Sequence, residues 1–359
     1  MRRMGGGILL RLLLVLVLAA AGVAGWQWLG YRQFSDAPLA GVDADASLVV
    51  SRGDSLDSVL RKLDEQGIAT GSRLHWQVLA RQTGAAGKLQ VGEYALARAG
   101  SPRALLLAMR DGKVVRRMFT IVEGWNIREL RAALAKTPLL EQETAGLDDA
   151  ALMKALGRAG QHPEGRFLPE TYAWVRGDAD LDILRRAHAD MDKALDEAWA
   201  SRAPGLPLKN RDEALVLASI VEKETGIAAE RAQIAGVFVR RLEMGMRLQT
   251  DPTVIYGMGA AYKGNIRRTD LTTDTPYNTY TRSGLTPTPI AMPGQAALRA
   301  ATRPAEGDAL YFVAVGDGSG RHVFSRTLGE HNAAVRAYVQ RYRAQRQAER
   351  AQAAAAPTP

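Results

Sequence analysis

The stretch that decides the fold is LASIVEKETG, from Leu217 to Gly226, a largely apolar run that carries two glutamates. Successive residues of an α-helix turn by about 100°, so Glu222 and Glu224 cannot share one helix face. On such a helix Glu224 falls near the centre of the apolar sector, and Glu222 falls on the opposite side. We therefore expect Glu224 to face the interior and Glu222 to face solvent or a neighbouring element.

We expect this helix to occupy residues 211–225. Asn210 with Glu213 three residues later resembles a capping box, and Gly226 suits the C-terminal cap. A carboxyl group on an apolar face loses hydration, which raises its pKa and keeps it protonated near neutral pH, as a general acid requires. The alternative is that Glu224 pairs with an arginine and only ties two helices together. The candidate partners for that pair are Arg231, Arg240 and Arg241.

A long polar stretch, residues 246–295, follows the next predicted helix at 228–244. We expect it to be irregular, and loops of this length are uncommon unless they are functional. Amides, hydroxyls and tyrosine rings suit an extended sugar polymer, whose hydroxyls need polar partners and whose faces stack on aromatic planes. The candidate binding residues are Gln249, Asp251, Tyr277, Asn278, Thr279 and Tyr280. The alternative is a surface loop whose side chains satisfy its own turns.

Residues 1–31 predict a membrane anchor. Arg2 and Arg3 precede a long apolar stretch, which places the N-terminus in the cytoplasm and the remainder beyond the membrane. Three aromatic residues close the stretch as an interfacial belt: Trp26, Trp28 and Tyr31. We expect the anchor to be retained and residues 32–45 to form a linker. The alternative is a signal peptide that is cleaved at the small residues 22–24.

The rest of the chain predicts an α+β fold in two parts. Residues 46–114 show a strand, two helices and a second strand, and then another helix. Residues 115–345 predict a larger mixed α+β domain with a glycine-turn hairpin and a final helix. The segment HPEGRFLPETYAW, 162–174, predicts a proline-rich loop within it, and residues 346–359 predict a flexible tail.

The composition of the 359-residue chain excludes several kinds of site. It contains no cysteine, which excludes disulfides and thiolate chemistry, and its five histidines show no metal-ligand spacing. No nucleotide-binding or nucleophilic-serine motif occurs, so we expect neither metal nor cofactor. His331, in the last predicted helix, is expected to be structural or exposed. The net charge of +9 suits anionic lipid or an acidic polymer, whereas the absence of a nucleic-acid-binding signature predicts no nucleic-acid partner.

Several longer motifs occur in a fixed order: EGRFLPETY, ASIVEKET, RLEMGMRLQTDPTVIYGMG, YNTYTRSGLTPTPIAMPG and HVFSRTLGEHN. With the N-terminal anchor, they resemble the endolytic murein transglycosylases of the YceG-like family over about residues 46–345. The resemblance implies a single-pass inner-membrane protein whose LysM-like subdomain (46–114) and catalytic domain (115–345) lie in the periplasm. It implies cleavage of the β-1,4 bond between N-acetylmuramic acid and N-acetylglucosamine within glycan strands. The family's catalytic glutamate matches Glu224.

The resemblance also implies a mechanism with one carboxyl group. Glu224 protonates the glycosidic oxygen, then takes the proton of the C6 hydroxyl of muramic acid, which closes to a 1,6-anhydro product. No water is added, so the second carboxylate of ordinary glycosidases is unnecessary. Glu222 and Thr225 would support Glu224 without touching the substrate. The implied partners are peptidoglycan strands, inner-membrane lipid and peptidoglycan synthases (penicillin-binding proteins), with cleavage ending the elongation of nascent strands.

Two alternatives of other classes stay open. In the first, the protein is a membrane-tethered scaffold that binds peptidoglycan without cutting it, and Glu224 is paired. In the second, it is an ordinary hydrolase that uses Asp251 or Glu222 as a second carboxyl group. Analysis of the reducing ends separates the three functions, which predict anhydro ends, no cleavage and free reducing ends respectively.

Overall fold

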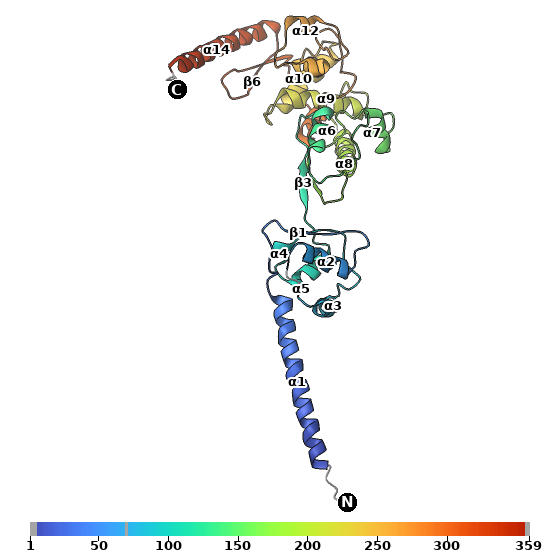
Figure 1. Cartoon of the computed structure of the whole chain (residues 1–359). Coiled ribbons are helices and arrows are strands. Elements are labelled where there is room, and N and C mark those ends of the chain that lie inside the picture. The colour runs from blue at the N-terminus through green and yellow to red at the C-terminus, as the bar shows by residue number, and fades with distance from the viewer. Residues whose placement is uncertain (1–5, 69–70, 356–359) are drawn as a thin grey trace, which may run out of the picture. The chain divides into compact units, whose positions relative to one another are not determined.

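The structure is a computed structural model that describes residues 6–68 and 71–355 (Figure 1). Arg2 and Arg3, on which the predicted orientation depends, and residues 356–359 of the predicted tail lie outside the described residues. The fold is mixed α+β, as predicted, and the chain divides into two compact units. Unit 1 is Met1–Arg117 with Ala173–Asp178, and unit 2 is Met118–Tyr172 with Ala179–Pro359.

The N-terminal helix α1 spans Gly6–Asp36 without interruption and is long and apolar enough to cross a membrane. Its residues 10–29 are exposed, whereas Tyr31 and Ser35 near its end are buried in unit 1. The predicted linker therefore begins later than expected. Its first residues continue the helix, because they pack against the rest of the unit.

Unit 1 contains the predicted strand–helix–helix–strand order. Its elements are β1 (Ser47–Val50), α2 (Leu56–Glu65), α3 (Arg73–Gln82), β2 (Gly92–Ala95), α4 (Leu96–Ala99) and α5 (Pro102–Asp111). We call β1 through α5 the first subdomain. β1 and β2 pair antiparallel, with Ser47 opposite Ala95 and Val50 opposite Gly92. Trp76 is its largest fully buried side chain, at the centre of one apolar core.

Unit 2 holds most of the helices, which surround a central one, α9. Its elements, with the two strands it shares with unit 1, are β3 (Arg117–Thr120), α6 (Ile127–Ala135), α7 (Asp149–Ala155), β4 (Thr171–Trp174), α8 (Asp180–Ala200), α9 (Arg211–Glu224), α10 (Arg231–Glu243), α11 (Asp251–Met258), the 3-10 turn η1 (Gly259–Ala261), α12 (Arg268–Thr272), α13 (Gln295–Thr302), β5 (Tyr311–Ala314), β6 (His322–Ser325) and α14 (Leu328–Ala355). β3 pairs with β4, and β5 pairs antiparallel with β6.

Helix α9 is the centre of the core of unit 2. Every residue from Ala214 to Val221 is buried, because α8, α10 and α13 pack around the helix. A helix that is apolar on all sides needs such complete cover. The one-sided apolar sector expected from the sequence is therefore too narrow, and Glu224 stands at the C-terminal end of a helix whose middle is buried on all sides.

Three parts of unit 2 differ from the sequence-based expectation. The stretch 246–295 is not wholly irregular, since α11 and α12 lie within it. Pro252 at the start of α11 suits the first turn of a helix, so a local signal existed. The predicted loop 162–174 ends in β4, whose pairing with β3 is a long-range contact. Helix α14 continues to Ala355, so the predicted tail is helical up to that residue.

Candidate functional site

Both ends of α9 are held by hydrogen bonds. At the N-terminal end, the Asn210 side chain accepts from the Glu213 amide at 3.0 Å. Glu213 bonds the Lys209 amide at 2.7 Å, so the predicted capping box is not reciprocal. The C-terminal cap is Thr225, in extended conformation, rather than the expected Gly226. The helix therefore ends at Glu224.

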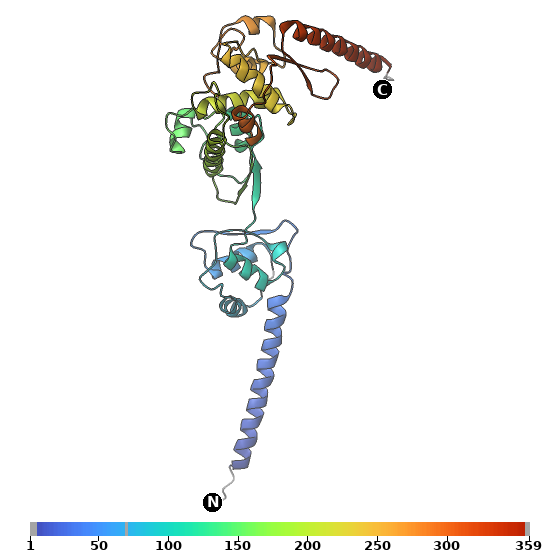
Figure 2. The same ribbon diagram turned by 180° about the vertical axis from the view of Figure 1, so that it is seen from behind.

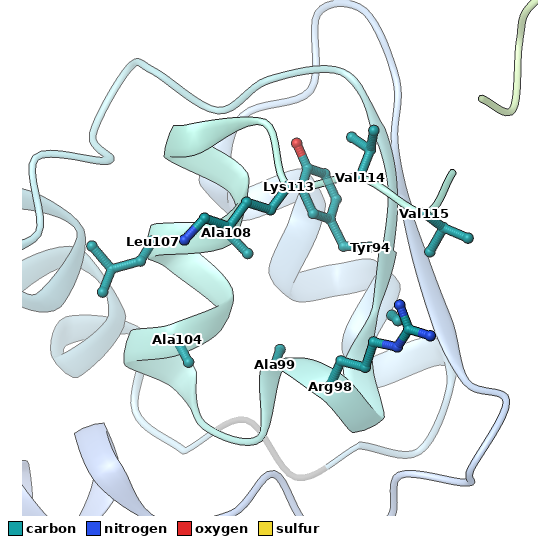
Figure 3. A pocket seen from close by; sticks show the side chains of 10 residues that line it. Tyr94, Arg98, Ala99, Ala104, Leu107, Ala108, Lys113, Val114 and Val115 are labelled. Atoms are coloured by element: carbon teal, nitrogen blue, oxygen red, sulfur yellow. The ribbon is translucent and has the colours of Figure 1, made fainter. Parts of the chain in front are cut away.

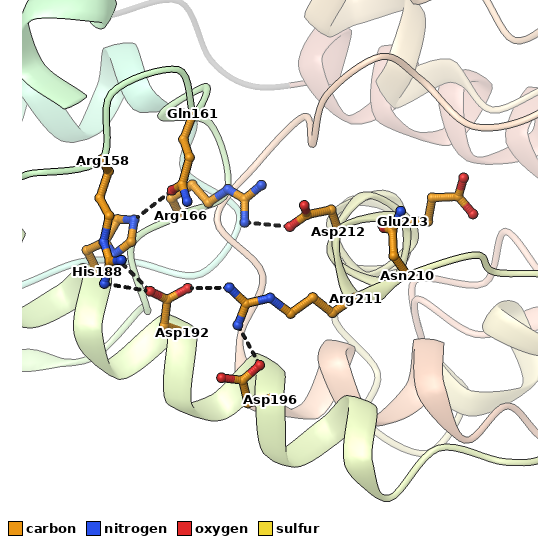
Figure 4. Close-up of polar contacts among 10 residues, drawn as sticks. All are labelled: Arg158, Gln161, Arg166, His188, Asp192, Asp196, Asn210, Arg211, Asp212 and Glu213. Carbon is orange, nitrogen blue, oxygen red and sulfur yellow. Dashed lines mark hydrogen bonds and ion pairs between the residues drawn. The ribbon is translucent and has the colours of Figure 1, made fainter. Parts of the chain in front are cut away.

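Ion pairs tie the N-terminal half of α9 to α8 and to the loop before β4 (Figure 4). Arg211 bonds Asp196 at 2.5 Å and Asp192 at 3.2 Å on α8. Arg166 bonds Asp212 at 2.7 Å. Burial lowers the pKa of His188, which lies beside Asp192. These contacts fix the helix at the end away from Glu224, so they position that residue rather than take part in its chemistry.

Glu224 has an environment that favours its protonated form. Burial raises the pKa of its carboxyl group to about 7, and the negative charge of Asp251 adds to this effect. The Thr250 hydroxyl donates a hydrogen bond to Oε1, which acts in the opposite direction. Within the described residues no arginine forms an ion pair with Glu224. Arg231 instead pairs with Glu222 at 3.4 Å, and Arg241 donates to backbone carbonyls such as that of Leu248.

A short network of threonines supports the residue that bonds Glu224. The Thr250 amide donates to the Thr279 hydroxyl oxygen at 3.1 Å. The Thr253 and Thr279 hydroxyls lie 2.9 Å apart, and Thr253 donates to the Thr250 carbonyl at 2.8 Å. Thr250 is 3% exposed, so it has little freedom to leave Glu224. Thr279 therefore belongs to this network and not to an open surface. Thr250 and Thr253 were not among the residues predicted from the sequence.

Glu224 lines a pocket of about 500 Å³ in unit 2. Three other predicted residues line it: Gln249, Asp251 and Tyr280. Five predicted residues are not among its lining: Glu222, Thr225, Tyr277, Asn278 and Thr279. The structure thus brings one acid, a second carboxyl group, an amide and a phenol together around one cavity.

Asp251 and Tyr280 form a pair in this pocket. The Tyr280 hydroxyl donates to Asp251 Oδ1 at 2.6 Å. Burial raises the pKa of Tyr280, and the hydrogen bond to Asp251 adds to that shift. Gln249 is exposed and has a φ of +50°, a conformation that non-glycine residues rarely adopt and that stores strain at functional sites. The Gln249 backbone is held by the Thr279 carbonyl at 3.2 Å.

The side-chain amide of Asn278 forms hydrogen bonds with its own loop. Its side chain is 1% exposed and donates to the carbonyls of Asp270, Leu271 and Thr273 at 3.1, 3.2 and 2.7 Å. Its Oδ1 accepts from the Tyr280 amide at 2.9 Å. All of these bonds are internal, so the geometry assigns Asn278 to the loop and not to the glycan, contrary to our expectation.

Tyr277 also packs within unit 2 rather than into the pocket. Its hydroxyl lies 2.9 Å from that of Thr288, and its ring meets Tyr256 edge-on with 4.9 Å between centroids. Thr225 is buried, and its hydroxyl accepts from the Ile227 amide at 2.9 Å. Both residues shape the surroundings of α9, and neither is placed to touch a ligand in this pocket.

Glu222 faces a neighbouring element, one of the two options we expected. Its carboxylate is 5% exposed, accepts from the Gly294 amide at 2.9 Å and pairs with Arg231. Burial raises its pKa. A side chain added at Gly294 would lie 1.9 Å from Glu123 Oε1, the far end of an exposed side chain that would have to move aside. Glu222 therefore joins α9 to the segment before α13.

The far wall of the pocket comes from β5 and α14, which the sequence analysis did not connect with Glu224. Tyr311 and His331 stack, with 5.2 Å between centroids and 24° between planes. The Arg241 guanidinium lies 5.1 Å from the Tyr311 centroid. His331 Nδ1 is buried with no hydrogen-bond partner among the described residues, and burial lowers the pKa of this ring. Only the motif GEHN could have pointed to His331.

The sequence model of the YceG-like family matches residues 48–337 of this chain. The chain belongs to the YceG-like family. An endolytic murein transglycosylase of Bacillus subtilis is 31% identical over 310 residues, 81% of this chain and 84% of that protein. One from Streptococcus pneumoniae is 31% identical over 187 residues, 51% of this chain and 32% of that protein. A YceG-like protein of Listeria monocytogenes has a crystal structure with a TM-score of 0.50 and 28% identity, covering 80% of this chain and 98% of that chain.

This YceG-like chain has a second pocket of about 630 Å³ in unit 2. It is lined by Lys223 and Pro252, the neighbours of Glu224 and Asp251, and by Tyr256. The Tyr256 hydroxyl donates at 3.0 Å to Glu164, a fully buried carboxyl group whose pKa burial raises to about 7. The two pockets therefore take lining residues from the same two segments of the chain, at 223–224 and 251–252.

Unit 1 has a pocket of its own, of about 450 Å³ (Figure 3). Its walls are small apolar residues of α4 and α5 and the ring of Tyr94, and its charged groups are Arg98 and Lys113. No acidic residue lines this pocket. Over the described part of the chain, no group of three or more histidines and carboxylates could hold a metal ion.

Proposed function

We propose that this protein is an endolytic lytic transglycosylase that cleaves the β-1,4 bond between N-acetylmuramic acid and N-acetylglucosamine within peptidoglycan strands. The observation that carries the proposal is the position of Glu224, a carboxyl group with a pKa of about 7 in the wall of a pocket. The relatives named endolytic murein transglycosylases support the substrate class. Such cleavage would end the elongation of nascent strands.

The proposed reaction uses Glu224 twice. The protonated carboxyl group donates to the glycosidic oxygen while the bond from that oxygen to C1 of muramic acid breaks. The carboxylate then accepts the proton of the C6 hydroxyl as O6 bonds to C1. The product is a 1,6-anhydro sugar, no water is consumed, and the glutamate returns to its protonated form. Because acid and base act in turn, a pKa near 7 serves both steps.

We assign Asp251 the task of stabilising the positive charge that develops at C1. It lies in the same pocket as Glu224, and its charge acts on Glu224 strongly enough to raise that pKa. The Tyr280 hydroxyl holds it in place. A negative charge that is held before the reaction stabilises a cation without rearrangement. Gln249 would hold the glycan from the same wall, by its exposed amide.

Two pockets whose lining residues include sequence neighbours support cleavage inside strands rather than at their ends. An enzyme that cuts internally needs sugar sites on both sides of the broken bond. One pocket contains Glu224 and Asp251, and the other begins at Lys223 and Pro252. We propose that the glycan strand runs through both, with the scissile bond above Glu224.

The two alternatives fit the geometry less well. A scaffold with a paired Glu224 would lower the pKa of that carboxyl group, whereas burial raises it. A hydrolase would need a second carboxyl group within reach. Glu222 is held by Arg231 and the Gly294 amide outside the lining of the pocket, whereas Asp251 lies in it. The hydrolase that uses Asp251 is therefore the second candidate.

Product analysis in labelled water tests the proposal. Purified full-length protein is incubated with uncrosslinked glycan strands in water enriched in oxygen-18. A lytic transglycosylase leaves anhydro ends that are lighter by one water and carry no label, and it gives fragments of mixed length. A hydrolase leaves labelled reducing ends, and a scaffold leaves the strands intact. Either of the last two results would refute the proposal. Glu224→Gln protein serves as the inactive control in the same assay.

We further propose that α1 anchors the protein in the inner membrane, with both later parts in the periplasm. The helix is apolar and exposed over residues 10–29, which supports this location. Residues 46–114 would form a LysM-like subdomain and 115–345 the catalytic domain, and peptidoglycan synthases would be partners. The strand–helix–helix–strand order supports the LysM-like assignment. Sedimentation of Glu224→Gln protein with insoluble peptidoglycan tests this assignment. The experiment is done with and without soluble chitin oligomers, which compete for binding by residues 46–114.

A further inference from the structure

Helix α1 is joined to the first subdomain by aromatic contacts with α3. The ring of Tyr31 lies 5.8 Å from that of His75, and its hydroxyl donates to Gln82. The ring of Phe34 meets Trp76 edge-on at 5.3 Å between centroids. These residues occupy the last turns of α1 and one side of α3. The two helices therefore share a packed interface within unit 1.

A second set of contacts joins the end of α1 to α5. Arg103 pairs with Asp36 at 2.8 Å and donates to the Ser35 hydroxyl at 3.1 Å. The Leu39 amide donates to the Gly100 carbonyl at 3.0 Å, and the Leu39 side chain is buried. With two helices holding its end, α1 enters the first subdomain as a fixed element and not through a free linker.

These contacts set the height of α3 above the membrane. The exposed apolar part of α1 ends at Leu29, and Tyr31 follows two residues later. At 1.5 Å of rise per residue, Tyr31 lies about 3 Å beyond the apolar span. Because α3 contacts Tyr31 directly, it lies at the level where the hydrocarbon gives way to headgroups. Figures 1 and 2 both show α3 on the side of the first subdomain where α1 arrives.

The outer face of α3 is unusual for a water-facing helix. Leu74 is 64% exposed and Val78 is 42% exposed, and the spacing of four residues puts them on one face. Arg73 and Arg81 are exposed on the same helix, and neither forms an ion pair among the described residues. Apolar side chains flanked by basic ones are typical of helices that lie in a membrane interface.

We propose that α3 lies in the outer surface of the same phospholipid bilayer that α1 crosses. Leu74 and Val78 enter the boundary between headgroups and acyl chains, roughly 5–10 Å deep, and Arg73 and Arg81 meet lipid phosphates. The first subdomain is then held on the membrane at fixed height and orientation by two helices. This inference depends on the proposed anchor but not on the proposed reaction.

A lipid surface fits this face better than a protein partner does. The apolar area is two side chains wide, too little for a stable protein interface, which buries about 800 Å² on each side. It lies on a helix that contacts the last turns of α1, at Tyr31 and Phe34, directly after the apolar span. The cations suit the phosphates that every phospholipid carries.

Fluorescence quenching by brominated lipids tests the proposal on the full chain. The protein has no cysteine, so Leu74→Cys and Val78→Cys each give one site for an environment-sensitive label. The control is Arg52→Cys, an exposed position after β1, a strand that both views place away from α1. Each labelled protein is reconstituted in phosphatidylethanolamine–phosphatidylglycerol vesicles with bromine at a shallow acyl position. Circular dichroism melting of each labelled protein, compared with the unlabelled protein, confirms that it is folded.

We expect blue-shifted emission at positions 74 and 78 that shallow bromines quench, and water-like, unquenched emission at position 52. Unquenched, water-like labels at 74 and 78 in protein that still floats with the vesicles would place α3 off the membrane and overturn the proposal. Blue-shifted but unquenched labels would assign the face to a protein contact, which also overturns it. Protein that fails to float would refute the anchor and this inference together, while cleavage of glycan strands would be unaffected.

Discussion

The proposed reaction depends on Glu224, because its carboxyl group must donate and accept a proton. Glu224→Gln keeps the shape and removes the ionisable group, so we expect cleavage of glycan strands to be abolished without loss of fold. Release of anhydro products measures the first effect, and circular dichroism melting measures the second. The control is Glu222→Gln, two residues away, which should retain most of its activity because Glu222 serves Arg231 and the Gly294 amide. The opposite pair of phenotypes would show that the acid is Glu222.

The pH dependence should report the pKa of Glu224. The acid form is present below its pKa of about 7 and is lost above it, so kcat/KM should fall on a basic limb near that pH. Asp251→Asn removes a charge that raises this pKa, so its limb should move to lower pH. Thr250→Val removes a hydrogen bond that lowers this pKa, so its limb should move to higher pH. Limbs that stay in place in both variants would assign the profile to another group.

On the scale of loops and helices, Asn278 and Gln249 should give opposite results. Asn278→Ala leaves buried carbonyls without their donor, which costs about 1–3 kcal/mol and lowers Tm by roughly 2–12 °C. Gln249→Ala removes an exposed amide from the pocket, so kcat/KM should fall roughly 5- to 150-fold with little change in Tm. Thermal melting and steady-state kinetics of both variants decide it. A stable but inactive Asn278→Ala variant would show that Asn278 binds the substrate.

The helices were predictable where the pattern is local. The apolar spacing and Asn210 placed α9 close to its observed span, and Pro102 and Gly112 bracketed α5 as expected. β4 was not predictable in the same way, because a four-residue strand after a proline-rich segment is stabilised by its partner β3. Two-stranded pairing of this kind leaves almost no trace in the strand's own sequence.

The site was predictable only in part, for a related reason. The helix-face argument isolated Glu224, and the polar loop indicated Gln249, Asp251 and Tyr280. The wall from β5 and α14 was missed, because these elements line the pocket of Glu224 from a distant part of the sequence. Asn278 was predicted to bind the glycan and its side chain bonds its own loop, because composition cannot show whether an amide bonds a ligand or its own loop.

The stability of the molecule as a whole should depend on pH through Glu164. This carboxyl group is fully buried, and burial raises its pKa to about 7 from 4.5. Between those values the folded chain keeps a proton that the unfolded chain has lost. Its stabilising contribution is therefore complete below about pH 4.5 and is lost as the pH rises through 7, a change of roughly 3 kcal/mol.

Glu164→Gln mimics the protonated acid and should remove that share of the pH dependence. Urea unfolding at pH 5 and pH 8 measures it as the difference between the two free energies of unfolding, compared with the unaltered protein. Glu170→Gln, at an exposed position nearby in sequence, is the control and should leave the difference unchanged. An unchanged difference in Glu164→Gln as well would mean that Glu164 is ionised in the fold at both pH values.

Retention of the anchor is a prediction that the continuity of α1 supports. A peptidase that cut at residues 22–24 would act in the middle of a regular helix whose last turns belong to the core of unit 1. We therefore expect the mature protein to keep residues 1–29 and to stay in the membrane fraction through high-salt and alkaline washes. Intact-mass measurement of protein extracted from membranes checks the N-terminus.

A chain that begins at residue 30 is the matched control for those washes. It keeps Tyr31, Phe34 and the rest of the docked turns but loses the apolar span and its three arginines, so its net charge falls from +9 to +6. It should still adhere weakly to anionic lipid or wall, and salt should release it, because screening at 1 M shortens the range of charge interactions to about 3 Å. Should the native protein also be released by salt, with an N-terminus near Gly25, the helix is a cleaved signal and not an anchor.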